Sequence, residues 1–315
     1  MGQTEQSAMW PRSAETRATP TSSAFPAQQN RSSENQLLQN LDSTFLVGGP
    51  ATPFPAFLHS MDSDIKFKPE TLMNILRDSS HESWVLAAYP DPQTSRPLIG
   101  AGFNLDVRAT EHLQTDPLNP HTFVEPSSAQ LWQAAGLSPE RLQVILDQFD
   151  RELKAWNKKR FRRKVRNHEL PPELTEEQAA RLLQISVVLA VHNARAYCRD
   201  FDLLTASQQM ALSQLVFQMG VNLEEFVEFL GVINDPSYGD SGNDGSNPET
   251  GREHWKAVQG ALIQSEWARR YTTRAIAVIA MFDPDYDQDP EKAEHEVSAV
   301  LHPPVLHHHK KKKVE

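Results

Sequence analysis

The pattern of hydrophobic positions divides the chain into a periodic centre and two ends without periodicity. Residues 1–45 are rich in Ser, Thr, Pro, Gln and Asn and have few large aliphatic side chains. This composition cannot bury enough apolar surface to offset ordering entropy, and it predicts a disordered N-terminal segment. Residues 46–69 have scattered hydrophobic positions broken by Gly and Pro, which predicts an extended linker packing on the core. The polar stretch 289–315 predicts a disordered C-terminal tail.

Helical periodicity begins near Lys68. Leu72, Ile75 and Leu76 stand three and four residues apart, and the apolar residues Trp84, Leu86 and Tyr89 follow. We therefore expect a helix here, with Glu82 near its C-terminal end or just past it. The segment 97–103, PLIGAGF, follows. Its alternation and its glycines, which allow close backbone approach, predict short β-structure.

Three helical segments come next, each preceded by an N-capping residue. The capping signals are Ser138, Thr175 and Thr205, and each stands directly before a periodic apolar run. The acidic stretch 235–251 is full of turn residues and predicts a mobile surface loop before helical periodicity resumes. The predicted class is α+β, predominantly α, with the main domain over residues 70–288.

Composition excludes several functional classes. The 315-residue chain is 39% hydrophobic, which is enough for a substantial core, and its net charge of -10 argues against a general polyanion binder. The basic run Lys158–Arg166 favours a solvated helix face over nucleic-acid binding, because Phe161 is its only aromatic residue. No zinc, phosphate-loop or dinucleotide signature is present. We expect no metal, no cofactor and no nucleic-acid partner.

The number of cysteines and the hydropathy of the chain bear on the cellular compartment that we expect for this protein. Cys198 is the only cysteine, so no internal disulfide can form, and a structural thiol is favoured over a catalytic one. No apolar run approaches the roughly 20 residues that span a bilayer, and the N-terminus lacks the hydrophobic core of a secretory signal. The expectation is a monomeric protein made in the cytoplasm, without a membrane span.

Two carboxylates carry the candidate chemistry. Asp91 follows Glu82 by nine positions. Apolar neighbours favour the protonated form of Glu82, whereas Asp91, between two prolines, is expected to stay hydrated and ionised. An unequal pair of this kind suits glycoside hydrolysis, although the spacing by itself allows any glycosidase that uses two carboxylates.

Several motifs resemble the phage-type lysozymes, the muramidases of tailed-phage endolysins, over about residues 70–285. In the C-terminal half the matching elements are Phe217–Gly220 (FQMG), Trp255, Ser265 with Trp267, and Arg274 with Ala275. In the N-terminal half they are Glu82, Tyr89, Asp91, Ile99–Gly102, and the helix start at Thr175. The resemblance implies a lysozyme-like fold with a small β-hairpin lobe and a larger helical lobe.

The resemblance also implies an activity and the residues that perform it. The substrate would be peptidoglycan, cleaved at the β-1,4 bond between N-acetylmuramic acid and N-acetylglucosamine. Glu82 matches the general acid, Asp91 the second carboxylate and Arg274 the arginine that orients the acid. Phe217 and Gln218 match substrate-binding residues of the cleft.

The chain departs from the family at the hairpin, which usually reads Pro-Thr-Ile-Gly-x-Gly-His. Leu98 replaces the threonine that helps to position the attacking water, and Phe103 replaces the histidine. Thr94 or Ser95, in a longer turn, is then expected to supply the hydroxyl, and Asn104 to bind sugar. Two alternatives stay open. One is cleavage like that of a lytic transglycosylase, and the other is a non-catalytic lysozyme-fold protein that binds glycan or another partner.

The expected site of action is the periplasm or the cell wall, reached after lysis or by specialised secretion. Segment 1–45 would suit loading or targeting in such a system. The roles left open are phage lysis, a secretion apparatus and an antibacterial effector. An immunity protein or a carrier protein is the partner that this setting implies.

Overall fold

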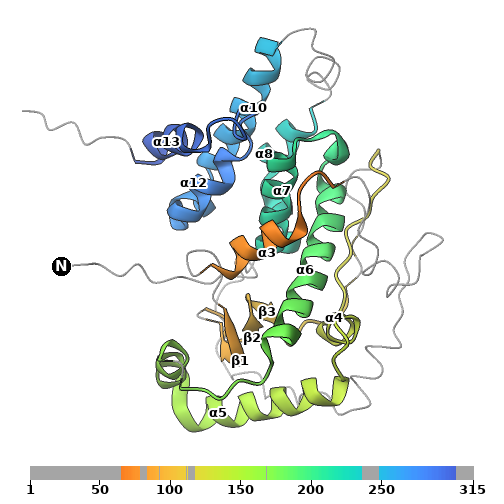
Figure 1. Cartoon of the computed structure of the whole chain (residues 1–315), viewed down its shortest axis with the longest axis vertical. Helices are drawn as coiled ribbons and strands as arrows, with labels where there is room; N and C mark the ends of the chain where they lie inside the picture. Colours follow the sequence, from red (N-terminus) through yellow and green to blue (C-terminus); the bar gives the residue numbers. More distant parts are fainter. Residues whose placement is uncertain are drawn as a thin grey trace, which may run out of the picture. The chain divides into compact units, whose positions relative to one another are not determined.

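The computed structural model describes residues 65–78, 84–91, 93–110, 112, 118–167, 169–235 and 248–302. The predicted segment 1–45, most of the linker and Glu82 lie outside these ranges. Within them the chain is mostly helical and has a three-stranded antiparallel sheet, so the α+β, mainly helical class is confirmed (Figure 1). Where the sequence predicted one domain over 70–288, the chain forms two compact units, divided between Glu225 and Phe226.

The first unit contains the sheet and the longest helices. Its elements are α3 (Pro69–Arg77), β1 (Val85–Pro90), β2 (Pro97–Gly100), β3 (Phe103–Asn104), α4 (Ser128–Ala134), α5 (Pro139–Arg166), α6 (Glu176–Tyr197), η1 (Phe201–Leu203), α7 (Ala206–Met219) and η2 (Gly220–Glu225). The second unit contains α8 (Val227–Ile233), α10 (Pro248–Ile263), α11 (Glu266–Arg270), α12 (Thr272–Ala280) and α13 (Pro290–Leu301).

The sheet forms where the sequence predicted β-structure and also where it predicted a helix. Strands β2 and β3 lie within the predicted segment 97–103 and the residue after it, and Gly100 and Gly102 take φ of 61° and 80° at the turn between them. The helical prediction for residues 84–89 was wrong, because residues 85–90 form β1. Pairing with β2 on one edge and bonds from the amides of Glu173 and Leu174 to the Leu86 carbonyl outweigh the apolar spacing.

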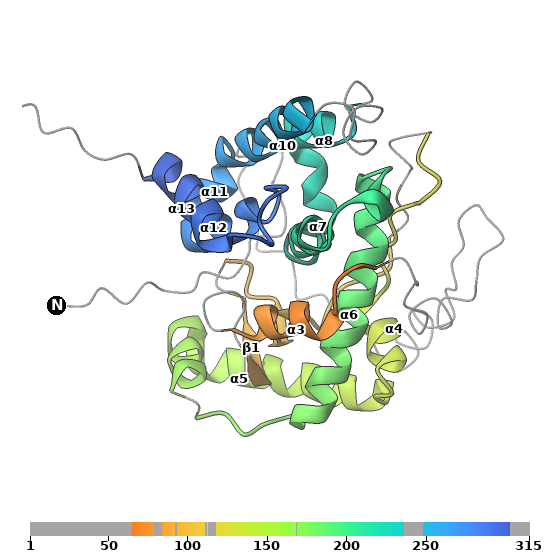
Figure 2. The same ribbon diagram turned by 45° about the horizontal axis from the view of Figure 1, so that its top comes forward.

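Helix α6 runs through the middle of the first unit (Figure 2). It packs on α7, α3, α4 and β2, and most of its side chains are buried. The three predicted N-caps are confirmed: Ser138, Thr175 and Thr205 accept hydrogen bonds from the backbone amides three residues on. Each cap satisfies an amide that the first helical turn leaves without a partner.

The residues before α3 pack on the same unit. Lys66 donates from its amide to Gln209 Oε1 at 2.8 Å and from Nζ to the Leu204 carbonyl at 2.7 Å, and Phe67 is buried. The end of the predicted linker therefore packs on α7 and the turn before it.

The basic run Lys158–Arg166 is the C-terminal part of α5, beyond a break at Asn157. Phe161 is 1% exposed, and its ring centroid lies 5.5 Å from that of Phe149. The ammonium of Lys164 lies 3.2 Å from the ring centroid of Trp156. The aromatic residue of the run therefore belongs to the core and offers no surface for base stacking.

The second unit extends beyond the predicted domain end. Helix α13 occupies residues 290–301, so the prediction of a disordered tail from residue 289 was wrong there, whereas residues 303–315 lie outside the described part of the chain. The Asp289 side chain caps this helix by accepting from the Lys292 amide, and Ala293 and Val297, four positions apart, are buried. Residues 248–251 of the predicted loop begin α10, whereas 236–247 lie outside the described residues.

No helix in the described part of the chain is long and apolar enough to cross a membrane. The longest, α5, contains the basic run, and the next, α6, begins with two glutamates.

Phe161→Ala should lower the free energy of unfolding by about 3–5 kcal/mol, because it leaves a cavity beside Phe149 in a closely packed core. Val144→Ala on the same helix, where the side chain is 60% exposed, should change it by less than about 0.5 kcal/mol. Urea denaturation of both variants measures the difference. Equal stabilities would contradict the core role of Phe161.

Candidate functional site

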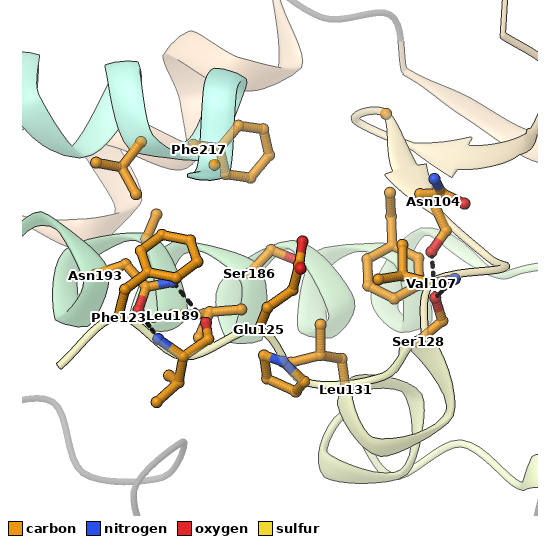
Figure 3. Close-up of a pocket in the computed structure, with 17 residues that line it drawn as sticks. Asn104, Val107, Phe123, Glu125, Ser128, Leu131, Ser186, Leu189, Asn193 and Phe217 are labelled. Atoms are coloured by element: carbon orange, nitrogen blue, oxygen red, sulfur yellow. Dashed lines mark hydrogen bonds between the residues drawn. The ribbon is translucent and has the colours of Figure 1, made fainter. Parts of the chain in front are cut away.

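A pocket in the first unit brings together Asn104 and Phe217, two residues that the sequence analysis assigned to substrate binding (Figure 3). It encloses about 680 Å³ of space between protein atoms, part of it open to solvent. Residues of β3, α4, α6 and α7 line it, together with the segment before α4. The apolar side chains in its wall include Phe103, Phe123, Leu131, Leu189 and Phe217, and the polar ones are Asn104, Glu125, Ser128, Ser186 and Asn193.

Ser128, the first residue of α4, joins two parts of the pocket wall. Its hydroxyl donates to the Asn104 carbonyl at 2.7 Å and accepts from the Val107 amide at 2.7 Å. The side-chain oxygen of Asn104 accepts from the Asp106 amide at 3.0 Å. These bonds hold the backbone after β3, so Asn104 has a defined position although it lies at the end of a two-residue strand.

Asn193 on α6 fixes the opposite part of the wall. Its side-chain oxygen accepts from the Val124 amide at 2.9 Å, and its Nδ2 donates to the Val124 carbonyl at 2.8 Å. The two bonds pair the buried side-chain amide with the backbone of one residue. They place Phe123 and Glu125, on either side of Val124, in the pocket lining beside α6.

A carboxylate and an imidazole that no sequence motif indicated also belong to this site. Glu125 lines the pocket, and its Oε2 lies 3.2 Å from Nε2 of His112. The His112 ring meets the Phe123 ring edge to face at a centroid distance of 4.8 Å. The sequence contained a signal for this part of the wall, because Ser127 and Gln130 form the capping box of α4, which begins three residues after Glu125.

Asp91 does not have the environment that the sequence predicted. The expectation of a hydrated turn was wrong: Asp91 is 4% exposed, and its Oδ1 accepts from the Gln93 amide, the Thr94 amide and the Thr94 hydroxyl at 2.6–2.9 Å. The C-terminal part of α5 covers the turn, where Arg162 donates to the Asp91 carbonyl at 3.3 Å and Lys158 to the Gln93 carbonyl at 3.1 Å. The Asp91 carboxylate is thereby removed from water, whereas Gln93 and Thr94 of the same turn stay exposed.

The two predicted water-positioning residues belong to the same turn. The Thr94 hydroxyl donates to Asp91 and accepts from the Arg96 amide at 3.3 Å, so the turn uses its single donor and one of its two acceptor lone pairs. Ser95 takes φ of 63°, and its amide donates to the Asp91 carbonyl. Neither residue lines the pocket that contains Asn104 and Phe217, and neither does Asp91.

Leu98, the main departure from the lysozyme hairpin, has an apolar role. It pairs with Tyr89 across β1 and β2, and the two buried side chains form a small cluster with Val85 and Val165. Val165 comes from the C-terminal part of α5. A threonine at this position would bury its hydroxyl against apolar side chains, which is costly without a partner.

The remaining predicted residues are not brought to the pocket. Glu82 lies outside the described residues, and Arg274 is buried on α12 of the second unit, so their pairing stays a prediction. Gln218 is 4% exposed on α7 and does not line the pocket. Among the described residues, its side-chain amide has no hydrogen-bond partner.

Two further groups bear on the chemistry of this unit. Burial of His192 on α6, together with the charge of nearby His121, lowers its pKa to about 4, so it is neutral at pH 7. Burial raises the pKa of the Cys198 thiol to about 12, which keeps it protonated and unsuited to nucleophilic attack. No group of three or more His, Cys, Asp and Glu side chains in the described ranges could hold a metal ion.

The chain matches no protein-family model, no curated protein and no solved structure. Any assignment of function therefore depends on the motifs of the sequence and the geometry of the first unit.

Asp91→Ala should lower the free energy of unfolding by about 1–3 kcal/mol, because it removes a buried carboxylate that accepts three hydrogen bonds from the turn. Asp91→Asn keeps an acceptor oxygen and should lose less than about 1 kcal/mol. Thermal melting of the two variants compares them. An Asn variant as unstable as the Ala variant would show that the turn needs the negative charge itself.

Cys198 in the folded protein should not react with a thiol-specific disulfide reagent at about pH 8. The residue is 1% exposed, and with a pKa of about 12 only a fraction on the order of 10⁻⁴ is thiolate at that pH. Unfolding in urea should release one reactive thiol per chain, which serves as the control. Rapid labelling of the native protein would contradict the buried, structural assignment.

Proposed function

We propose that the chain is a peptidoglycan muramidase that cleaves the β-1,4 bond between N-acetylmuramic acid and N-acetylglucosamine. The observation that carries the proposal is the pocket, since Asn104 and Phe217 were selected from sequence motifs far apart in the chain and line it together. The small antiparallel sheet beside a mainly helical body also supports it.

The pocket has a lining suited to a sugar ring. Phe123 and Phe217 offer apolar faces for the C–H groups of a pyranose, and Asn104 contributes polar groups for its hydroxyl or N-acetyl groups. Phe217 is partly exposed, as a ligand contact requires, whereas most of α7 around it is buried.

Hydrolysis requires an acid for the leaving oxygen and negative charge near the oxocarbenium-like centre. In the proposed mechanism Glu82 protonates the glycosidic oxygen as its bond to the anomeric carbon breaks, and a water molecule adds to that carbon and loses a proton. Arg274 orients the Glu82 carboxyl group. Asp91 is the second carboxylate. Because three hydrogen bonds fix its Oδ1 in the turn, its proposed contribution is a fixed charge that stabilises the transition state.

A second candidate reaction is that of a lytic transglycosylase. In that reaction the 6-hydroxyl of the muramic acid attacks its own anomeric carbon, the glycosidic oxygen leaves with a proton, and a 1,6-anhydro sugar forms. The burial of Leu98 and the commitment of the Thr94 O–H to Asp91 favour it, because Leu98 has no polar group and Thr94 has no further proton to donate to an attacking water. Mass spectrometry of released muropeptides separates the two, since hydrolysis leaves reducing ends and transglycosylation leaves anhydro ends.

A third candidate is a lysozyme-fold protein that binds glycan or another partner without cleaving it. Cleavage of purified wall by the wild type excludes it. For the cleaving enzyme, the proposed site of action is the periplasm or the cell wall, reached after lysis or by specialised secretion, with an immunity or carrier protein as partner.

Glu82→Gln should reduce the rate of turbidity loss and muropeptide release from purified peptidoglycan by about 10²–10⁴-fold, because glutamine cannot donate the proton. Glu296→Gln, on the second unit with a side chain 57% exposed, is the control and should keep wild-type activity. Equal rates for wild type and Glu82→Gln would remove Glu82 from the mechanism.

A further inference from the structure

Glu125 is the carboxylate that faces the pocket from the segment before α4. In Figure 3 its carboxylate points into the middle of the pocket, between the ring of Phe217 and Asn104. The side chain is 25% exposed, which leaves it accessible to a ligand while much of it is covered. Neither the motifs of the sequence nor the proposed mechanism uses this residue.

The backbone of Glu125 is held from two directions. Its carbonyl accepts from the Thr110 amide at 2.9 Å in an isolated antiparallel bridge. The preceding residue, Val124, is paired on both its amide and its carbonyl with Asn193 of α6. A carboxylate on a backbone held in this way loses little conformational freedom when a ligand binds.

The side chain of Glu125 is oriented by His112. The His112 ring, 14% exposed, lies with Nε2 at 3.2 Å from Oε2 of Glu125, and it packs edge to face on Phe123. Oε2 is thereby engaged. No bond from the described residues is made to Oε1, which remains as an acceptor for a ligand.

The surroundings of Glu125 restrict the kind of ligand. The wall of the pocket is mainly apolar and includes Phe103, Phe123, Leu131 and Phe217. A strongly hydrated ion would lose its water shell in such a pocket, and one carboxylate that already contacts His112 would not compensate for this cost. A neutral ring with apolar C–H faces and hydroxyl or N–H donors on its rim fits both the wall and the acceptor.

We propose that Glu125, positioned by His112, accepts hydrogen bonds from the hydroxyl or acetamido N–H groups of one N-acetylhexosamine unit bound in this pocket. The inference rests on the proposed function, because it takes the glycan as the substrate, and it adds a specificity-determining contact to it. His112 acts through Glu125 and is a positioning residue.

The test measures binding separately from cleavage. The full-length chain with Glu82→Gln, which prevents turnover, is titrated with the tetramer of N-acetylglucosamine, and Kd is measured by calorimetry. In this background Glu125→Ala should weaken binding by about 100-fold and Glu125→Gln, which keeps an acceptor, by about tenfold. His112→Gln should weaken it by about threefold to tenfold.

Glu140→Gln, at an exposed position on α5 of the same unit, is the matched control and should leave Kd unchanged. Melting temperatures separate binding from folding: the Glu125 and His112 variants should melt close to the parent. In the active background, Glu125→Gln should raise KM for soluble glycan strands more than it lowers kcat.

Kd values within twofold of the parent for both Glu125 variants would overturn the inference and leave the muramidase proposal standing. A fall in the melting temperature of the variants without a change in Kd would also overturn the inference, since it would give Glu125 and His112 a purely structural role. Wild-type cleavage of purified wall without binding of the tetramer by the parent would also overturn the inference alone. Tetramer binding that weakens as predicted, without cleavage by the wild type, would support the contact and reject the muramidase.

Discussion

The burial of α6 is the constraint on which the rest of the first unit depends. A helix packed on several neighbours is more stable when its polar side chains have partners, because a buried amide or guanidinium without hydrogen bonds costs several kcal/mol. Asn193 meets this requirement through Val124, and Arg195 through Asp202 at 2.9 Å. Asn119 donates to the Arg195 carbonyl, so the segment before α4 is bonded to α6 at two places. The hydrogen bonds of the polar groups on α6 thus fix the position of the segment that forms part of the pocket wall.

The turn between β1 and β2 shows a different use of a carboxylate. Asp91 and Thr94 bond to one another and to local amides, and Arg162 of α5 donates to the Asp91 carbonyl. The same helix contributes Val165 to the apolar cluster around Leu98 and Tyr89. The replacement of a hairpin threonine by leucine is therefore consistent with the position of α5. Its kink at Asn157 redirects the basic segment, whose Phe161 enters the core and whose Arg162 bonds to the turn.

The carboxylates of Asp91 and Glu125 consequently differ in their availability to a ligand. Asp91 is surrounded by donors from its own turn, whereas Glu125 is shared between one imidazole and an open pocket. A buried carboxylate with three donors on one oxygen acts through its charge and through the shape it gives the turn. A partly exposed carboxylate that lines a pocket can also recognise a ligand by hydrogen bonding. This difference sets the proposed division of roles between catalysis and sugar recognition.

The sequence by itself determined the features that depend on a few neighbouring residues. The caps at Ser138, Thr175 and Thr205 and the glycine turn after β2 were predictable, because a capping bond or a positive φ involves positions within about three residues. Two pocket residues, Asn104 and Phe217, were also selected from motifs. Strand β1, helix α13 and the burial of Asp91 were not, since each depends on a partner elsewhere in the chain. Only the tertiary structure brings His112 and Glu125 together and pairs Val124 with Asn193, because these contacts join segments that no local pattern relates.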